Sequence, residues 1–130
     1  MRFLAVVAVL VFLACDASQP EKPHVMELSQ QEFMSQAPGS YLVLDVRTPE
    51  EFAAGHLDKA LNISHDRLAD QLPQIQQYAA TPVLLYCRSG NRAAKAAEVL
   101  AKAGFTNLHH LTGDMQGWEA AGLPVVKDGS

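Results

Sequence analysis

The sequence has few of the residues that mark several large classes of protein. Only two cysteines, Cys15 and Cys87, occur in 130 residues, which excludes a disulfide scaffold and a cysteine-rich zinc site. The 10 lysines and arginines are fewer than the 14 acidic residues and form no cluster, so we expect no nucleic-acid partner. Charged residues make up 18% and hydrophobic residues 48%, which is a globular composition. The length suits one domain.

The one long apolar run lies at the N-terminus, where residues 3–14 follow Arg2 without a polar interruption. This run is too short for a membrane span of about 20 residues, but its length and single positive flank are typical of a secretory signal. It ends in Ala14 and Cys15, and resembles the lipobox of bacterial lipoproteins, in which the signal is cut before a cysteine that carries lipid. A plain secretory cut after Ala17 is the alternative.

We therefore expect a signal peptide at residues 1–14, a tether at residues 15–23 and one folded domain at residues 24–130. The tether contains Pro20 and Pro23 and no large apolar side chain, which is typical of a linker. This organisation predicts a protein of the bacterial cell envelope, on the periplasmic side, with Cys15 as the lipidation site. The lipid would be its only contact with the membrane.

From residue 24 onward, short apolar runs alternate with segments that carry helix signals. The expected strands are residues 24–27, 41–44, 60–63, 82–86 and 108–111. Ser29 and Thr48 each stand three residues before a glutamate, as in a helix capping box. Pro73 should divide residues 68–78 into two short helices. A longer helix should bury Ala93, Ala96, Ala97 and Leu100, and a last helix should carry Met115 and Trp118. This alternation predicts an α/β fold, in which a mostly parallel sheet of about five strands carries helices on both faces.

Cys87 stands at the end of the most apolar predicted strand, just before a helix. Gly90, three residues later, permits the positive backbone angle that a tight loop needs. If the loop curls round the sulfur, its N–H groups form an anion-binding nest, to which the helix N-terminus, Arg88 and Arg92 add positive charge. These effects favour the nucleophilic thiolate, and the same cradle would hold an anion such as thiosulfate. The alternative is an inert buried thiol.

Three blocks of sequence carry a family resemblance. Cys87, Gly90 and Arg92 match the pattern C-x-x-G-x-R, and residues 45–57 and 104–124 match two further blocks in the same order. Over residues 25–126 the chain resembles a single-domain rhodanese, of the sulfurtransferase family. Ala93 replaces a common Ser or Thr, which removes one hydroxyl near the sulfur. Asp58-Lys59 replace a common Pro-Gly and Asp114 a common Gly, and because these positions lie outside the loop we expect no effect on the chemistry.

The resemblance implies a rhodanese-like fold and a thiosulfate sulfurtransferase. Cys87 would be the catalytic residue, taking the sulfane sulfur of the donor as a persulfide and passing it to an acceptor. The substrate would be bound by the loop residues Arg88, Ser89, Gly90, Asn91 and Arg92. No metal or organic cofactor is implied. The expected partners are a small anionic sulfur donor and a thiol or cyanide acceptor, and a monomer is expected.

Two other functions remain open at this point. One is a non-catalytic rhodanese-like binding or sensor module at the cell envelope. The other is a cysteine-dependent phosphatase or arsenate reductase, whose loop has five residues between cysteine and arginine where this chain has four. Asp45, Arg47 and Glu51 either border the site or form a structural ion-pair cluster, and we favour the cluster. His56 is interpreted as a hydrogen-bonded turn residue and Trp118 as core.

Overall fold

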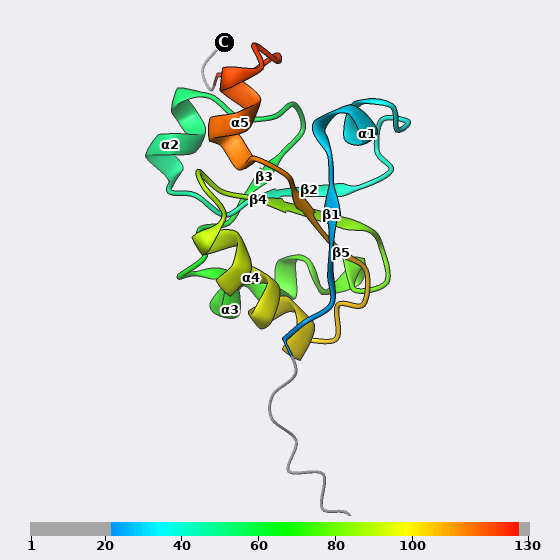
Figure 1. Cartoon of the computed structure of the whole chain (residues 1–130). Coiled ribbons are helices and arrows are strands. Elements are labelled where there is room, and N and C mark those ends of the chain that lie inside the picture. The colour runs from blue at the N-terminus through cyan, green and yellow to red at the C-terminus, as the bar shows by residue number, and fades with distance from the viewer. Residues whose placement is uncertain (1–21, 128–130) are drawn as a thin grey trace, which may run out of the picture.

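The computed structural model describes residues 22–127 (Figure 1). The predicted signal peptide, the lipidation site Cys15 and all but the end of the tether lie outside these residues. Within them, no helix has the length and apolar character that crossing a membrane requires.

The fold is the predicted α/β arrangement, with one sheet of five parallel strands in the order β1-β5-β4-β2-β3. The strands are β1 (Val25–Leu28), β2 (Leu42–Asp45), β3 (Leu61–Asn62), β4 (Val83–Tyr86) and β5 (Leu108–Leu111). The helices are α1 (Gln30–Met34), α2 (Pro49–Ala54), α3 (Leu68–Gln71), α4 (Asn91–Lys102) and α5 (Asp114–Ala120). Every predicted strand is therefore confirmed to within a residue or two.

The stretch after α3 is divided as Pro73 predicts, but its second part is not a helix of the α type. Two 3-10 turns follow instead, η1 (Leu72–Gln74) and η2 (Gln76–Tyr78). Proline has no backbone N–H to extend the hydrogen bonding of α3, so the chain turns in short steps. The turns still deliver Ile75, fully buried, to the core.

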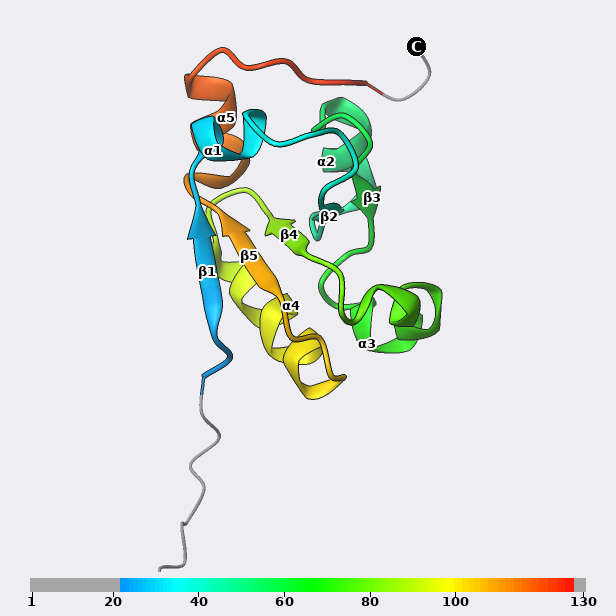
Figure 2. The same cartoon turned by 90° about the vertical axis from the view of Figure 1, so that its right-hand side faces the viewer.

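Helices cover both faces of the sheet. Figures 1 and 2 show α1, α2 and α5 on one side and α3 and α4 on the other. Each face has its own apolar cluster, and β4 contributes alternate residues to the two: Leu84 and Tyr86 lie in the cluster with α5, whereas Val83 and Leu85 lie in the cluster with α4, as does Cys87 just after the strand. All four residues of β4 are buried, as expected for the central strand of a parallel sheet.

Local signals set the helix ends as the sequence predicts. Thr48 and Glu51 form a reciprocal capping box at the start of α2, with Pro49 at the first helical position. Ser29 accepts the N–H of Glu32 at the start of α1. The capping box matters for the site because α2 carries Glu51, whose carboxylate reaches across to α4.

Replacement of Thr48 should therefore destabilise the fold measurably. Thr48→Ala leaves the Glu51 N–H without its 3.2 Å acceptor and should lower the free energy of unfolding by about 1 kcal/mol. Urea denaturation of the purified chain measures this. Thr48→Ser keeps the hydroxyl and should lie within a few tenths of a kcal/mol of the wild type; an equal loss in both variants would contradict the capping role.

Candidate active site

The site is built where β4 ends. The carboxyl ends of β2 and β4 lie side by side because Asp45 pairs in register with Tyr86, the residue before Cys87. The chain then turns into α4 through a loop whose turn requires Gly90, since the φ of this residue is +112°. The Gly90 N–H donates a hydrogen bond of 3.0 Å to Cys87 Sγ. The sulfur is thus a buried acceptor of a backbone N–H, on a side chain that is 1% exposed.

The first turn of α5 holds the other side of this loop. The Met115 N–H donates to the Cys87 carbonyl at 2.9 Å, and the Gln116 N–H donates to the Arg88 carbonyl at 3.1 Å. In a trans peptide, the N–H points opposite to the carbonyl of the preceding residue. The N–H groups of Arg88 and Ser89 are therefore directed away from α5. Of the amides in this loop, the Gly90 N–H is the one whose hydrogen bond to the sulfur is seen within the described residues, so the full anion-binding nest stays a prediction.

The five predicted substrate-binding residues differ in their surroundings. Arg88, Ser89 and Asn91 are exposed, and Gly90 is half-buried. The Arg92 guanidinium makes two hydrogen bonds to the Glu51 carboxylate, of 2.6 and 2.9 Å. This contact with Arg92 lowers the pKa of Glu51 from 4.5 to about 2. The pair joins the start of α4 to α2, and Arg88 is left as the exposed cation of the loop.

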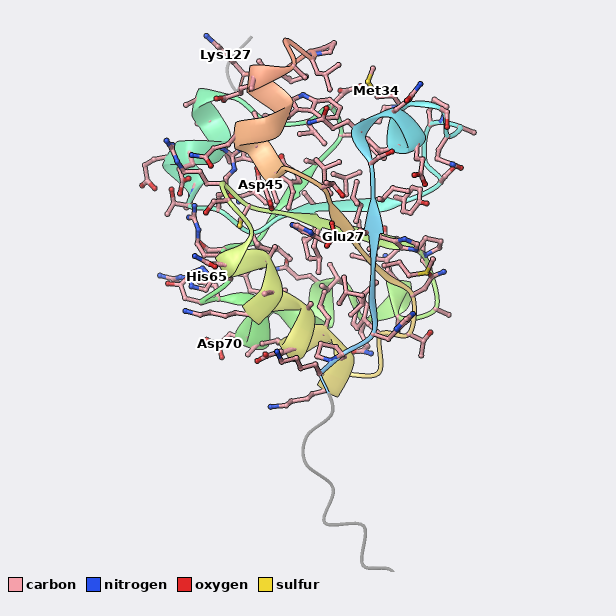
Figure 3. The ribbon with its side chains drawn as sticks, in the orientation of Figure 1. Glu27, Met34, Asp45, His65, Asp70 and Lys127 are labelled. Carbon is pink, nitrogen blue, oxygen red and sulfur yellow. The ribbon has the colours of Figure 1, made fainter. Side chains whose placement is uncertain are left out.

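Two of the three residues of the predicted structural cluster, Asp45 and Arg47, form an ion pair, whereas the third, Glu51, pairs with Arg92 instead. The Arg47 guanidinium donates to both Asp45 oxygens and to the Gly55 carbonyl, at 2.6–3.1 Å. Both side chains are almost fully buried, and Figure 3 shows Asp45 in the interior while Met34 and Lys127 lie at the surface. Asn62 donates to the carbonyls of Asp45 and Arg47, which fixes the neighbouring strand β3. The cluster therefore holds the strand ends around the site.

Asp114 lies outside the loop in the sequence, and we expected no effect on the chemistry, but in the structure it contacts the loop directly. Asp114 Oδ1 accepts the backbone N–H of Cys87 at 3.0 Å, although the two residues are 27 positions apart. Its side chain is 2% exposed. His110 in turn contacts Asp114 through Nε2, at 2.9 Å. Sequence reasoning missed both residues, and the one signal of their importance was the replacement of a glycine at position 114.

That replacement has a backbone explanation. Asp114 and Lys59 are the two non-glycine residues with positive φ within residues 22–127, at +52° and +61°. Both stand where related sequences often carry glycine. Aspartate tolerates the left-handed conformation better than most residues, because its short side chain hydrogen-bonds locally. Only Asp114 also gains contacts with the active-site loop.

The interpretation of Trp118 as core is confirmed, and that of His56 is confirmed in part. His56 is buried and hydrogen-bonded, with Nδ1 2.7 Å from the Phe52 carbonyl and its ring stacked on Phe52 at 3.6 Å. It does not lie in a turn, however, but forms an isolated antiparallel bridge with Val126. Trp118 is 4% exposed, and its indole N–H donates to the Pro124 carbonyl.

Comparison with known proteins shows which family the chain belongs to. Residues 29–121 match the rhodanese-like domain family. An uncharacterized protein of Synechocystis is 39% identical over 87 residues, covering 66% of this chain and 47% of its own length. The chain thus spans about half of that relative. Thiosulfate sulfurtransferase 16, chloroplastic, of Arabidopsis thaliana is 35% identical over 92 residues, covering 63% of this chain and 77% of its own.

A solved structure supports the same assignment. The crystal structure of a rhodanese-related protein from Thermoplasma volcanium superposes with a TM-score of 0.68 at 28% sequence identity. The match covers 78% of this chain and 97% of that one. With a family match over most of the described residues and the fold in common, the chain belongs to the rhodanese-like domain family, some of whose members are named sulfurtransferases.

Proposed function

We propose that the protein is a thiosulfate sulfurtransferase that works through a Cys87 persulfide. The observation that carries this proposal is the backbone hydrogen bond of 3.0 Å from the Gly90 N–H to Cys87 Sγ. Backbone N–H groups aimed at a sulfur stabilise its anionic form without a separate base. The similarity to a relative named thiosulfate sulfurtransferase favours sulfur as the transferred group.

The reaction proceeds in two displacement steps. The Cys87 thiolate attacks the sulfane sulfur of thiosulfate, an S–S bond forms to Cys87, and the S–S bond of the donor breaks to release sulfite. A thiol or cyanide acceptor then attacks the outer sulfur of the persulfide, and Cys87 leaves as the thiolate. With cyanide the product is thiocyanate. Atoms and charges balance in both steps without an added oxidant.

The chain supplies electrostatic stabilisation to both anions in this scheme. The Gly90 N–H already faces the sulfur, and the amides of Arg88 and Ser89 extend the same positive surface. The exposed Arg88 attracts the dianionic donor. Arg92 acts indirectly, because its two hydrogen bonds to Glu51 hold the first turn of α4 in place next to the loop.

The envelope location belongs to the same proposal and rests on the sequence alone. We infer that the signal ends before Cys15 and that a lipid on Cys15 anchors the domain on the periplasmic side. The acceptor would then be a molecule that reaches this compartment.

Mass spectrometry tests the persulfide. Incubation of the protein with thiosulfate should add about 32 Da to the wild type and nothing to Cys87→Ser, because a hydroxyl is a far weaker nucleophile at neutral pH. Circular dichroism of the Ser variant controls for folding. A folded wild type that gains no mass would refute the proposal. In that case hydrolysis of phosphate esters would indicate a phosphatase, and its absence would indicate a binding module.

The Glu51–Arg92 pair should make the free energy of unfolding depend on pH in the acid range. The folded-state pKa of Glu51, about 2, lies below the usual 4.5, so the pair stabilises the fold above pH 4.5 and loses this effect as the pH falls toward 2. Glu51→Gln should lower the free energy of unfolding at pH 7 by up to about 1 kcal/mol. The difference in the free energy of unfolding between wild type and Glu51→Gln should shrink below pH 4.5. Urea denaturation at several pH values measures it.

The exposed neighbour Glu50 provides the matched control for this measurement. Glu50→Gln removes the same charge from the same helix and should leave the stability within about 0.5 kcal/mol of wild type. Equal losses in the two variants, or a gap that stays constant to pH 2, would show that the pair with Arg92 is not the cause.

Fractionation of cells that express the full chain tests the anchor. The wild type should sediment with membranes, and Cys15→Ala should be soluble or retain its signal, because the lipid attachment point is gone. A wild type found entirely in the soluble fraction would contradict lipidation at Cys15.

A further inference from the structure

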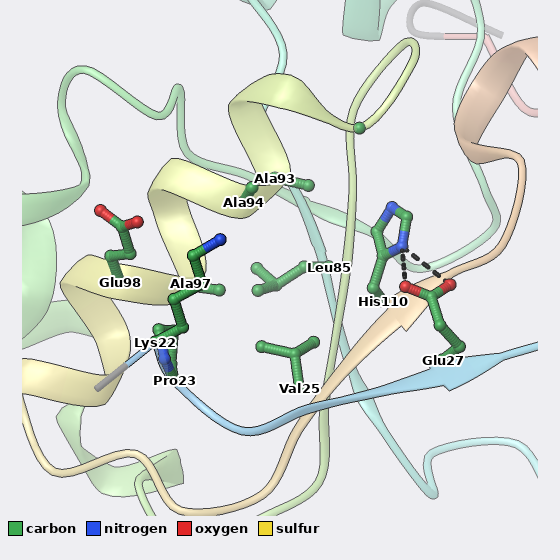
Figure 4. A pocket seen from close by; sticks show the side chains of 11 residues that line it. Lys22, Pro23, Val25, Glu27, Leu85, Ala93, Ala94, Ala97, Glu98 and His110 are labelled. Carbon is green, nitrogen blue, oxygen red and sulfur yellow. Dashed lines mark hydrogen bonds and ion pairs between the residues drawn. The ribbon is translucent and has the colours of Figure 1, made fainter.

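A histidine lies between two carboxylates next to the active-site loop. In the sheet register, Glu27 of β1 pairs with His110 of β5, which pairs with Leu85 of β4. His110 Nδ1 lies 2.8 and 3.0 Å from the two Glu27 oxygens. His110 Nε2 lies 2.9 and 3.0 Å from the two Asp114 oxygens. Figure 4 shows His110 and Glu27 at the wall of a pocket of about 380 Å³.

These contacts define the protonation state of the ring. A carboxylate only accepts hydrogen bonds, so each ring nitrogen must donate, and a histidine that donates from both nitrogens is an imidazolium. The hydrogen bond with Asp114, followed by the one with Glu27, raises the pKa of His110 to about 9 against the effect of burial. The ring lines the pocket, so it can exchange its proton with solvent.

Asp114 transmits this charge state to the sulfur. Its Oδ1 accepts the N–H of Cys87, and its Oδ2 would lie 3.3 Å from a Cβ placed on Gly90. The carboxylate thus contacts the peptide of the nucleophile and faces the glycine whose N–H donates to Sγ. An uncompensated negative charge at this place would oppose both the thiolate and the persulfide. His110 is the cation that contacts it.

We propose that His110 is a positioning residue for sulfur transfer, whose imidazolium neutralises Asp114 so that this carboxylate can hold the Cys87 peptide without suppressing ionisation of the sulfur. The inference rests on the proposed persulfide chemistry, since that chemistry is what needs an ionised sulfur. The charged groups around His110 are Glu27 from β1, Asp114 from α5, and Lys22 and Glu98 at the same pocket. Cys87 faces this side of the sheet from the end of β4.

Alkylation of Cys87 by iodoacetamide tests this without relying on sulfur transfer. Peptide mass spectrometry of the full chain gives the rate of Cys87 modification against pH. His110→Gln should react about tenfold more slowly than wild type at pH 7.5, since the charge of Asp114, 3.0 Å from the Cys87 peptide nitrogen, is then unopposed. The rate profile should move to higher pH and keep its plateau. His110→Lys restores the cation and should stay within about threefold of wild type.

Removing the charge of Asp114 distinguishes an electrostatic role of His110 from a purely structural one. In an Asp114→Asn background, His110→Gln should change the alkylation rate by less than about twofold, because no charge remains to be neutralised. Asp114→Asn alone should react at least as fast as wild type. Glu98→Gln, which removes a charge from the same pocket without contacting His110, is the matched control and should behave as wild type.

Three results would overturn the inference. They are a His110→Gln rate equal to wild type, a slowing that persists in the Asp114→Asn background, and a lowered plateau, which would indicate altered access to the sulfur. If His110→Gln does not fold, the Asp114→Asn variant still tests the inference: alkylation of Cys87 tenfold slower than in wild type would overturn it. Persulfide formation is scored separately: a chain that gains 32 Da from thiosulfate but shows no His110 effect refutes this inference alone.

Discussion

The site depends on the orientation of a few peptide groups at the end of β4. Two amides from the first turn of α5 bind the carbonyls of Cys87 and Arg88, and the planar peptide then directs the following N–H groups the other way. Gly90 completes the turn at a φ of +112°, which brings its N–H to the sulfur. If the carbonyls were released, the peptides could rotate, and the orientation that places the Gly90 N–H on the sulfur would be lost although Cys87 remained.

Several contacts from different elements maintain this orientation. The buried Asp45–Arg47 pair fixes the end of β2, which is in register with β4, and the Glu51–Arg92 pair fixes the start of α4. A buried ion pair is a costly way to gain stability, because both charges lose their hydration. Its benefit here is geometric: the guanidinium of Arg47 also binds the Gly55 carbonyl, so the end of α2 cannot shift independently of β2.

The parts that the sequence predicted correctly depend on neighbours along the chain. The apolar run of β4, the capping box at Thr48 and the glycine at position 90 are all local signals. The contacts that the sequence did not show join distant positions. Arg92 and Glu51 are 41 residues apart, and His110 and Glu27 are 83 apart. No spacing rule covers such pairs, because they exist only after the sheet order places the strands side by side.

Asp114 shows how a backbone requirement can conceal a functional contact. At Lys59, a residue other than glycine stands at a positive φ on an exposed turn. At Asp114 such a residue places a carboxylate 3.0 Å from the peptide nitrogen of Cys87. A buried carboxylate needs a cation, and the register of β1, β5 and β4 already aligns His110 with the face that carries Cys87. The edge strand β1 thereby has two roles, since it closes the sheet and, through Glu27, holds the histidine that neutralises Asp114.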